Sequence, residues 1–108
     1  RTSNITEIIR FPAVRRDLAF LIDKTCPVST VLKAITSNLQ QIKGCSIVKK
    51  LTPFDVYVGE DLPEGKKSIT FSVVMQNPSK TLEESELEVA CSGIVKLAEA
   101  VEGVSIRR

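Results

Sequence analysis

The chain has 108 residues, of which 43% are hydrophobic and 26% are charged, and its formal net charge at pH 7 is +2. This balance is typical of one soluble globular domain and excludes a disordered chain, and no apolar run reaches the roughly 18 residues that span a bilayer. The sequence contains no His, which excludes Ser-His-Asp and Cys-His catalysis and every His-ligated metal site.

The first half of the chain predicts a strand followed by a helix. Residues 1–10 are polar and predict a linker or an extra edge strand, so we assign the domain itself to residues 11–108. Apolar and polar residues alternate over 14–22, as in a half-buried strand. Pro27 suits the first turn of a helix, apolar residues follow at helical spacing, and Gly44 can supply a left-handed end. We therefore predict a helix over residues 27–43.

The middle of the chain predicts two strands joined by a hairpin loop. Residues 46–58 form the first of these strands. Pro53 cannot donate a backbone hydrogen bond, so this strand should lie at a sheet edge or carry a bulge there. Residues 59–67 are rich in Gly and Pro and predict the loop, and residues 68–76 alternate most clearly of all.

The last part predicts a helix and a short strand. Residues 81–84 fit a capping box, in which the Thr81 hydroxyl and the Glu84 carboxylate satisfy backbone donors. An apolar stripe then runs to Val101, Gly103 ends the helix, and residues 104–106 form a strand. The βαββαβ order predicts an α+β, ferredoxin-like sandwich with a four-stranded antiparallel sheet in the order 4-1-3-2. Two helices should cover one face of this sheet and leave the other face open.

The alternation assigns each strand residue to one face of the sheet. The face beneath the helices should hold the core residues Leu18, Phe20, Ile22, Phe54, Val56, Ile69, Phe71, Val73, Val104 and Ile106. The open face should display Arg15, Asp17, Asp55, Tyr57, Ser68, Thr70, Ser72, Ser105 and Arg107, with Lys66 continuing this face into the loop. The single Tyr of the chain therefore belongs to the open face.

A face of this composition suits unpaired RNA bases, because an aromatic ring can stack on a base while short polar side chains read its edges. The alternative is a solvated sheet face on which the Tyr ring only fills space. The alternation of apolar and polar residues fits an RNA-binding face and a solvated face equally well. Residues 83–102 contain six Glu and one Lys, so the basic excess lies in the rest of the chain. This distribution allows a basic face for nucleic acid, but it also fits an ordinary solvated acidic helix.

Three motifs give the chain a resemblance to a known family. They are FPAVRRDL at 11–18, FDVYVG at 54–59 followed by LPEGKKS at 62–68, and PSKTL at 78–82. Over residues 11–108 they resemble the ferredoxin-fold anticodon-binding domain at the C-terminus of the bacterial phenylalanyl-tRNA synthetase beta chain. The resemblance implies that the open face binds the anticodon of phenylalanine tRNA.

The resemblance also implies roles for single residues. It implies that Tyr57 stacks on the first anticodon base and that Asp55 and Ser68 hydrogen-bond to that base. Arg107 is the best match to an Arg that the family uses near the C-terminal strand. The family commonly has Arg or Lys after the Tyr, where this chain has Val58.

Further residues of the open face are candidates for RNA contact because they share that surface. These are Arg15, Lys66 and Thr70. Arg15 and Asp17 belong to the RRD signature of the family, and for them a structural role remains open, namely an ion pair across the first and third strands.

Catalysis is not expected within these residues, because they contain no phosphate loop, metal-ligand cluster or nucleophile constellation. The resemblance implies that ATP, Mg²⁺ and phenylalanine bind the alpha chain, so this domain holds no cofactor. It implies as partners the phenylalanine tRNA anticodon, the rest of the beta chain and the alpha chain in an alpha2-beta2 synthetase. Cys26, Cys45 and Cys91 form no CxxC pair, which favours a reducing, cytoplasmic location without a membrane. Because the chain opens on Arg1 without a signal peptide, we expect a piece of a longer protein.

The sequence fits two other functions less well. An enzyme of acylphosphatase type needs a phosphate-cradling loop after the first strand, and residues 23–27 contain neither the Gly nor the Arg of such a loop. A subunit-docking or regulatory module without RNA contact would need a large exposed apolar patch, whereas the predicted open face is polar. The docking module stays as the alternative.

Overall fold

The sheet and helices have the predicted order. The computed structural model describes residues 11–107, so the linker or edge strand expected over residues 1–10 lies outside the described residues. The elements are β1 (Val14–Asp23), α1 (Val28–Asn38), β2 (Val48–Tyr57), β3 (Lys66–Met75), α2 (Glu84–Glu99) and β4 (Ser105–Ile106). Two short 3-10 helices, η2 (Leu39–Gln41) and η3 (Cys45–Ile47), lie between α1 and β2.

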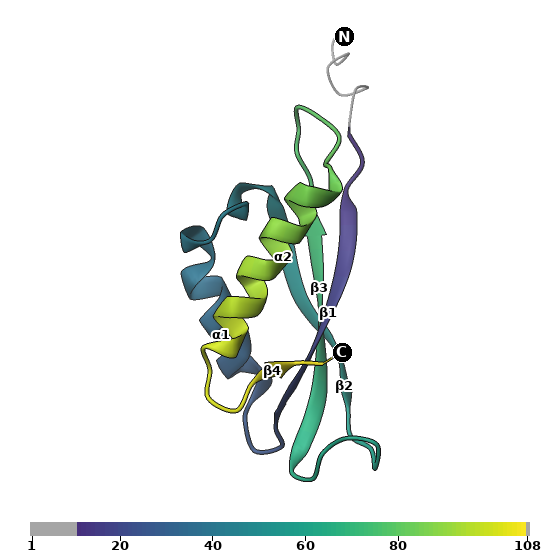
Figure 1. Ribbon diagram of the computed structural model, residues 1–108, viewed down its shortest axis with the longest axis vertical. Helices are drawn as coiled ribbons and strands as arrows, with labels where there is room; N and C mark the ends of the chain where they lie inside the picture. The colour runs from purple at the N-terminus through teal and green to yellow at the C-terminus, as the bar shows by residue number, and fades with distance from the viewer. Residues whose placement is uncertain (1–10, 108) are drawn as a thin grey trace, which may run out of the picture.

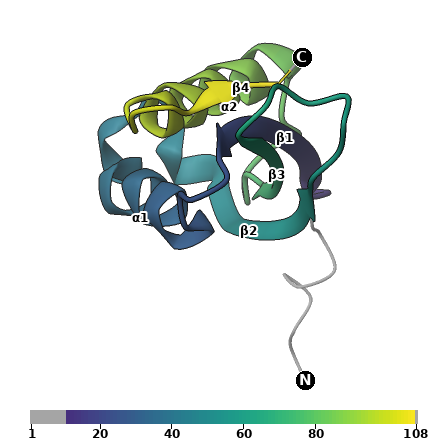
Figure 2. The same ribbon diagram turned by 90° about the horizontal axis from the view of Figure 1, so that it is seen from below.

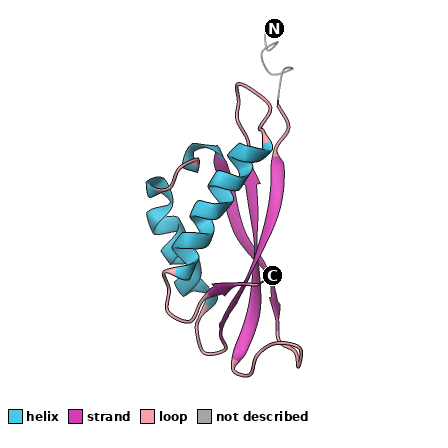
Figure 3. Ribbon diagram, in the orientation of Figure 1, coloured by secondary structure: helices cyan, strands magenta, loops and turns pink. Residues whose placement is uncertain are grey.

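The four strands form one antiparallel sheet in the order β2-β3-β1-β4. Both helices cover the same face of this sheet and leave the other face uncovered (Figures 1 and 3). The ferredoxin-like α+β sandwich and its strand order are therefore confirmed. Seen along the strands, the sheet is strongly twisted (Figure 2), as expected for long antiparallel strands.

The hydrophobic core lies between the sheet and the helices. The rings of Phe20 on β1 and Phe71 on β3 meet edge to face, with their centroids 5.9 Å apart. The side chains of β3 alternate between buried and partly exposed, as the sequence predicted. The helices contribute Val31, Ile35, Leu87, Ala90, Ile94 and Ala98 to the same core.

The helices begin and end at different residues than the sequence predicted. α1 ends at Asn38 and continues as η2, so Gly44, with φ of 81°, follows η2 rather than the α-helix. The N-cap of α2 is Glu83, and its capping box pairs Glu83 with Glu86. The box predicted over residues 81–84 is therefore wrong. Leu82 and Leu87 both enter the core. In a hydrophobic staple, the residue before the N-cap packs with the fourth residue of the helix. Leu82 and Leu87 hold these two positions when Glu83 is the N-cap.

The register of β2 shifts twice, between Val48 and Lys50 and between Pro53 and Asp55. The second shift is a bulge beside Pro53 on the edge strand, as the proline predicted. The bulge turns Phe54 out of the core, and the residue is 51% exposed, with the Arg15 guanidinium over its ring. The prediction of a buried Phe54 is therefore wrong. The prediction of a buried Val56 is also wrong: it pairs with Ile69 but is 53% exposed, because it stands near the end of the edge strand.

Candidate nucleic-acid interface

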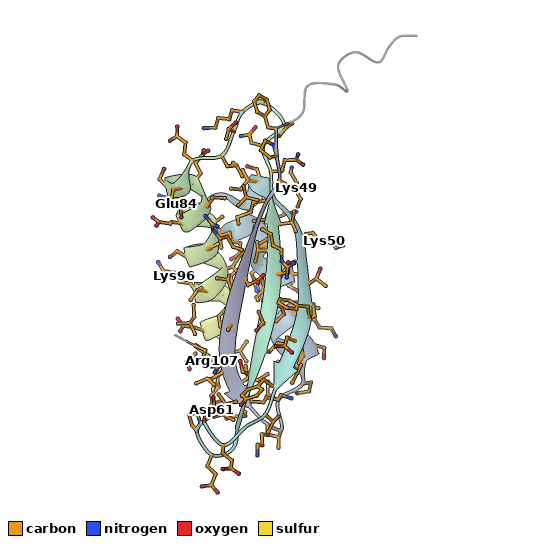
Figure 4. The ribbon with its side chains drawn as sticks, turned by 90° about the vertical axis from the view of Figure 1, so that its right-hand side faces the viewer. Lys49, Lys50, Asp61, Glu84, Lys96 and Arg107 are labelled. Carbon is orange, nitrogen blue, oxygen red and sulfur yellow. The ribbon has the colours of Figure 1, made fainter. Side chains whose placement is uncertain are left out.

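Several of the predicted polar residues of the uncovered face lie together near the β2–β3 loop, and Figure 4 shows Arg107 and Asp61 at this end of the sheet. The ladder between β2 and β3 places Asp55 opposite Thr70 and Tyr57 opposite Ser68. Residues directly opposite each other on one face of a sheet have side chains in contact range. The register therefore makes these four residues neighbours, as the alternation predicted.

A set of polar contacts joins β2, the β2–β3 loop and the residue after β4. The Tyr57 hydroxyl donates to Asp61 Oδ1 at 2.6 Å. The Arg107 guanidinium lies 5.7 Å from the centroid of the Tyr57 ring, and its Nη2 is 3.6 Å from Asp61 Oδ2. Arg107 Nη1 also donates to Ser68 Oγ at 3.4 Å. We call Tyr57, Asp61, Ser68 and Arg107 the Tyr57 cluster.

The cluster joins opposite edges of the sheet, because β2 and β4 are its outer strands. The backbone N–H of Arg107 donates to the Ala19 carbonyl at 2.8 Å, which fixes Arg107 beside β1. Its long side chain then extends over the uncovered face toward Ser68 on β3 and Tyr57 on β2. The β2–β3 loop reaches toward the C-terminal end of the chain (Figure 2), which places Asp61 beside Arg107.

The electrostatics of the cluster keep Tyr57 neutral and Asp61 ionised. The hydrogen bond from the Tyr57 hydroxyl lowers the pKa of the Asp61 carboxyl, and the nearby Arg107 acts in the same direction. The same hydrogen bond and the carboxylate charge raise the pKa of Tyr57, which Arg107 opposes. At neutral pH the cluster therefore presents a neutral phenol ring held between a carboxylate and a guanidinium.

The other predicted residues of this region differ in their access to solvent. Ser68 is only 2% exposed, and its hydroxyl accepts the hydrogen bond from Arg107. A base could reach this hydroxyl only if Arg107 moved. Asp55 is exposed and Thr70 is half-buried, so these two residues offer a carboxylate and a hydroxyl next to the Tyr57 ring.

Lys66 forms contacts within the protein rather than standing free on the surface. Its ammonium donates to Asp23 Oδ1 at 2.7 Å and to the Gly103 carbonyl at 2.9 Å. These bonds join β1, β3 and the turn before β4. Lys66 therefore closes one end of the sheet, and its charge is already balanced by Asp23.

Arg15 lies toward the other end of the uncovered face, and its contacts differ from the expected pairing. Its Nε donates to Asp17 Oδ1 at 3.0 Å, so the ion pair lies within β1 and not across two strands. The next residue, Arg16, instead pairs with Glu84 at the start of α2, at 2.9 Å. Arg15 and Arg16 thus form contacts on opposite faces of the sheet.

Two residues of this face were not found from the sequence. The sequence pattern predicts Asp61 only as part of a loop, and the available signal is an acidic residue four positions after the only Tyr. Phe54 was assigned to the core because unbroken alternation places it there. Pro53 was the one available signal, since it allows a bulge at this point.

The next features of residues 11–107 concern metal binding, cysteine chemistry and membrane insertion. This part of the chain has no group of three or more His, Cys, Asp or Glu residues that could hold a metal ion. The three cysteines are free, and burial raises the pKa of the Cys91 thiol. Among the described helices, none is long and apolar enough to cross a bilayer.

Comparison with known proteins gives a consistent result. The family model described as "Ferredoxin-fold anticodon binding domain" matches residues 10–107. The phenylalanine–tRNA ligase beta subunit of Acinetobacter baylyi is 36% identical over 105 residues, which are 97% of this chain and 13% of that protein. The beta subunit of Bacillus subtilis is 40% identical over 94 residues, which are 87% of this chain and 11% of that protein. The chain thus spans about one eighth of the length of these relatives.

Proposed function

This chain belongs to the ferredoxin-fold anticodon-binding domain family, and from that membership we propose that its uncovered sheet face binds the anticodon of phenylalanine tRNA. The observation that carries the proposal is the Tyr57 cluster. The only Tyr of the chain stands 41% exposed on this face with a guanidinium over its ring. An aromatic ring on an open sheet is the usual platform for an unpaired base.

Each residue of the region has a distinct chemical role in this proposal. The neutral Tyr57 ring stacks on the first anticodon base, and the hydrogen bond to Asp61 fixes the orientation of the ring. Asp55 accepts a hydrogen bond from the edge of that base, and Thr70 offers a hydroxyl beside it. Ser68 takes part once Arg107 moves from its hydroxyl.

Arg107 supplies the positive charge of the site. Its carboxylate partner Asp61 is 3.6 Å away, and both side chains are partly exposed, so the ion pair is weak and exchangeable. A phosphate of the RNA can replace Asp61 as the partner of the guanidinium, in a bidentate contact that Arg favours. Loss of the Arg107 contact to Ser68 would then free the serine for the base.

The domain acts in this proposal as a binding part of a larger enzyme and performs no chemistry itself. We propose that the rest of a beta chain and an alpha chain complete a cytoplasmic alpha2-beta2 synthetase, and that ATP and Mg²⁺ bind on the alpha chain. The assignment to a beta chain is supported by the relatives, which are beta subunits of a phenylalanine–tRNA ligase.

One observation favours the docking alternative as a second function of a different surface. A groove of about 680 Å³ lies between α2 and the segment at residues 41–43, in the helical layer, and is lined in part by Ile42, Val89 and Leu97. Val89 is an exposed apolar residue of α2. Because the groove and the Tyr57 cluster lie on opposite layers, contact with the rest of a beta chain and RNA binding are compatible.

The experiment measures the affinity of the chain for RNA hairpins that carry the anticodon loop of phenylalanine tRNA. A hairpin of the same stem with a changed anticodon is the control. We expect tighter binding of the first hairpin, with an affinity that falls as salt rises, at a log–log slope of about −0.7 per phosphate contact. Equal affinity for both hairpins would refute anticodon recognition.

A further inference from the structure

A second aromatic–guanidinium pair lies on the uncovered face, apart from the Tyr57 cluster. The Arg15 guanidinium stands 4.9 Å from the centroid of the Phe54 ring. Phe54 is one of the most exposed large apolar residues of the described chain, and the Arg15 side chain is 56% exposed. A large aromatic ring left half in water costs hydrophobic free energy. The β2 bulge therefore exposes the Phe54 ring at a cost in folding stability.

The surroundings of this pair form a shallow hollow with a defined chemistry. The hollow has a volume of about 400 Å³ and is lined by Arg15, Lys50, Thr52, Phe54, Ser72 and Val74. It therefore combines a planar apolar surface, two hydroxyl groups and two cations. Asp17 balances Arg15, whereas Lys50 has no ion-pair partner among residues 11–107. Lys50 is labelled in Figure 4 at the opposite end of the face from Arg107 and Asp61.

We propose that Phe54 and Arg15 form a second base-stacking site, which holds another unpaired nucleotide of the same RNA strand. The base stacks on the ring of Phe54 or on the Arg15 guanidinium plane, both of which are surfaces that bases use in single-stranded RNA recognition. Thr52 and Ser72 lie opposite each other in the ladder and offer hydroxyl groups to the base edge. Lys50 neutralises a phosphate. This inference rests on the proposed RNA function and extends it to a second position.

The placement of the two sites fits one continuous strand of RNA. Phe54 and Tyr57 are three residues apart on β2, which corresponds to about 10 Å along a strand. Asp55 lies between them on the same face. Two rings held at this separation on one sheet can each receive a base while the backbone passes between them, as in sheets that stack two or three bases. An RNA strand in this position also supplies a phosphate as the anionic partner of Lys50.

The absence of Trp from the chain allows a direct test. Phe54→Trp places a single Trp, which can be excited selectively, at the second site; Tyr57→Trp places one at the first site, and Val56→Trp provides the matched control. Val56 has a similar exposure on the same strand but pairs on the helix side of the sheet. On titration with the anticodon hairpin, we expect the emission of the Trp at 54 and of the Trp at 57 to change at the same RNA concentration. The Trp at 56 should not respond.

The affinity of Phe54→Ala provides the second measurement. A lost stacking contact should raise Kd by about 5- to 150-fold, and Phe54→Tyr, which keeps an aromatic ring, should restore binding. If the Trp at 57 responds while the Trp at 54 is silent and Phe54→Ala binds normally, the second site is refuted and anticodon binding stands. If no variant and no unmodified chain binds the hairpin, both proposals fail. If the Trp at 54 responds to synthetase subunits without RNA, the surface is a protein contact and the inference is wrong.

Discussion

Replacement of Tyr57 by Ala should weaken RNA binding strongly and the fold only slightly. The ring stands on the uncovered face, and its neighbours there are Asp61, Ser68 and Arg107 rather than the core. Loss of the ring removes the stacking partner of the base, which should raise Kd by about 5- to 150-fold. The variant also loses the hydroxyl that orients Asp61, so the loop and Arg107 become less ordered.

The expected effect on stability is small because Tyr57 remains 41% exposed in the folded chain. Surface substitutions of this kind change the free energy of unfolding little. For a domain of this size we expect the melting temperature of Tyr57→Ala to fall by less than about 4 °C.

Phe71→Ala is the matched control from the neighbouring strand. Phe71 is fully buried and packs edge to face on Phe20. Truncation of a buried Phe should cost roughly 3–5 kcal/mol, which lowers the melting temperature by more than about 12 °C. Thermal unfolding and hairpin binding are measured for both variants at a temperature where each is folded. If Tyr57→Ala melts as early as Phe71→Ala and binds RNA like the unmodified chain, Tyr57 is a core residue and the assignment of faces is wrong.

Three further outcomes follow from contacts in the structure. In the unmodified chain, the hydrogen bond to Asp61 and the Asp61 charge raise the pKa of Tyr57 above 10.0, so this pKa should fall in Asp61→Asn. Because the chain has one Tyr, an absorbance titration reports its pKa directly. An unchanged midpoint would contradict the contact. The bond contributes to stability below the unfolded pKa of Tyr57 and is lost as pH rises through the raised folded value. Gly93→Ala should destabilise the fold by roughly 1–3 kcal/mol in denaturant unfolding despite its better helix propensity, because its Cβ would lie 2.8 Å from Ile42 Cβ; a gain in stability would show that Ile42 moves freely. Lys66→Met should lower stability by roughly 1 kcal/mol and change RNA affinity less than Tyr57→Ala does, since its ammonium is already bound within the protein; a larger effect on binding would make Lys66 an RNA contact.

The arrangement of the strands was predictable because local patterns and chain connectivity determine it. The alternation on β3 separates Ile69 and Phe71 from Ser68 and Thr70, and right-handed crossovers leave one strand order for the βαββαβ sequence. The faces of Asp55, Thr70 and Arg107 follow from the same register. Each of these inferences uses only neighbouring residues and general rules of sheet geometry.

The remaining features depend on contacts between distant parts of the chain, which a local pattern does not contain. Alternation assumes an unbroken register, so it places Phe54 in the core, although the bulge that Pro53 allows turns this residue outward. Ser68 is buried because Arg107, 39 residues later, donates to its hydroxyl. Asp61 takes its place through Arg107 and Tyr57. The start of α2 also differs from the prediction, because the box over residues 81–84 considers only neighbouring residues, whereas the packing of Leu82 in the core accompanies an N-cap at Glu83.

The central claim is that the uncovered sheet face, and not the helical side, binds the anticodon loop. Its most direct test is NMR mapping of the ¹⁵N-labelled chain during titration with the anticodon hairpin of phenylalanine tRNA. The account predicts shifts concentrated at Asp55, Tyr57, Thr70 and Arg107, with the α1 and α2 amides unchanged. Shifts confined to the groove beside α2 around Val89 and Ile42, with no shift in the Tyr57 cluster, would contradict it.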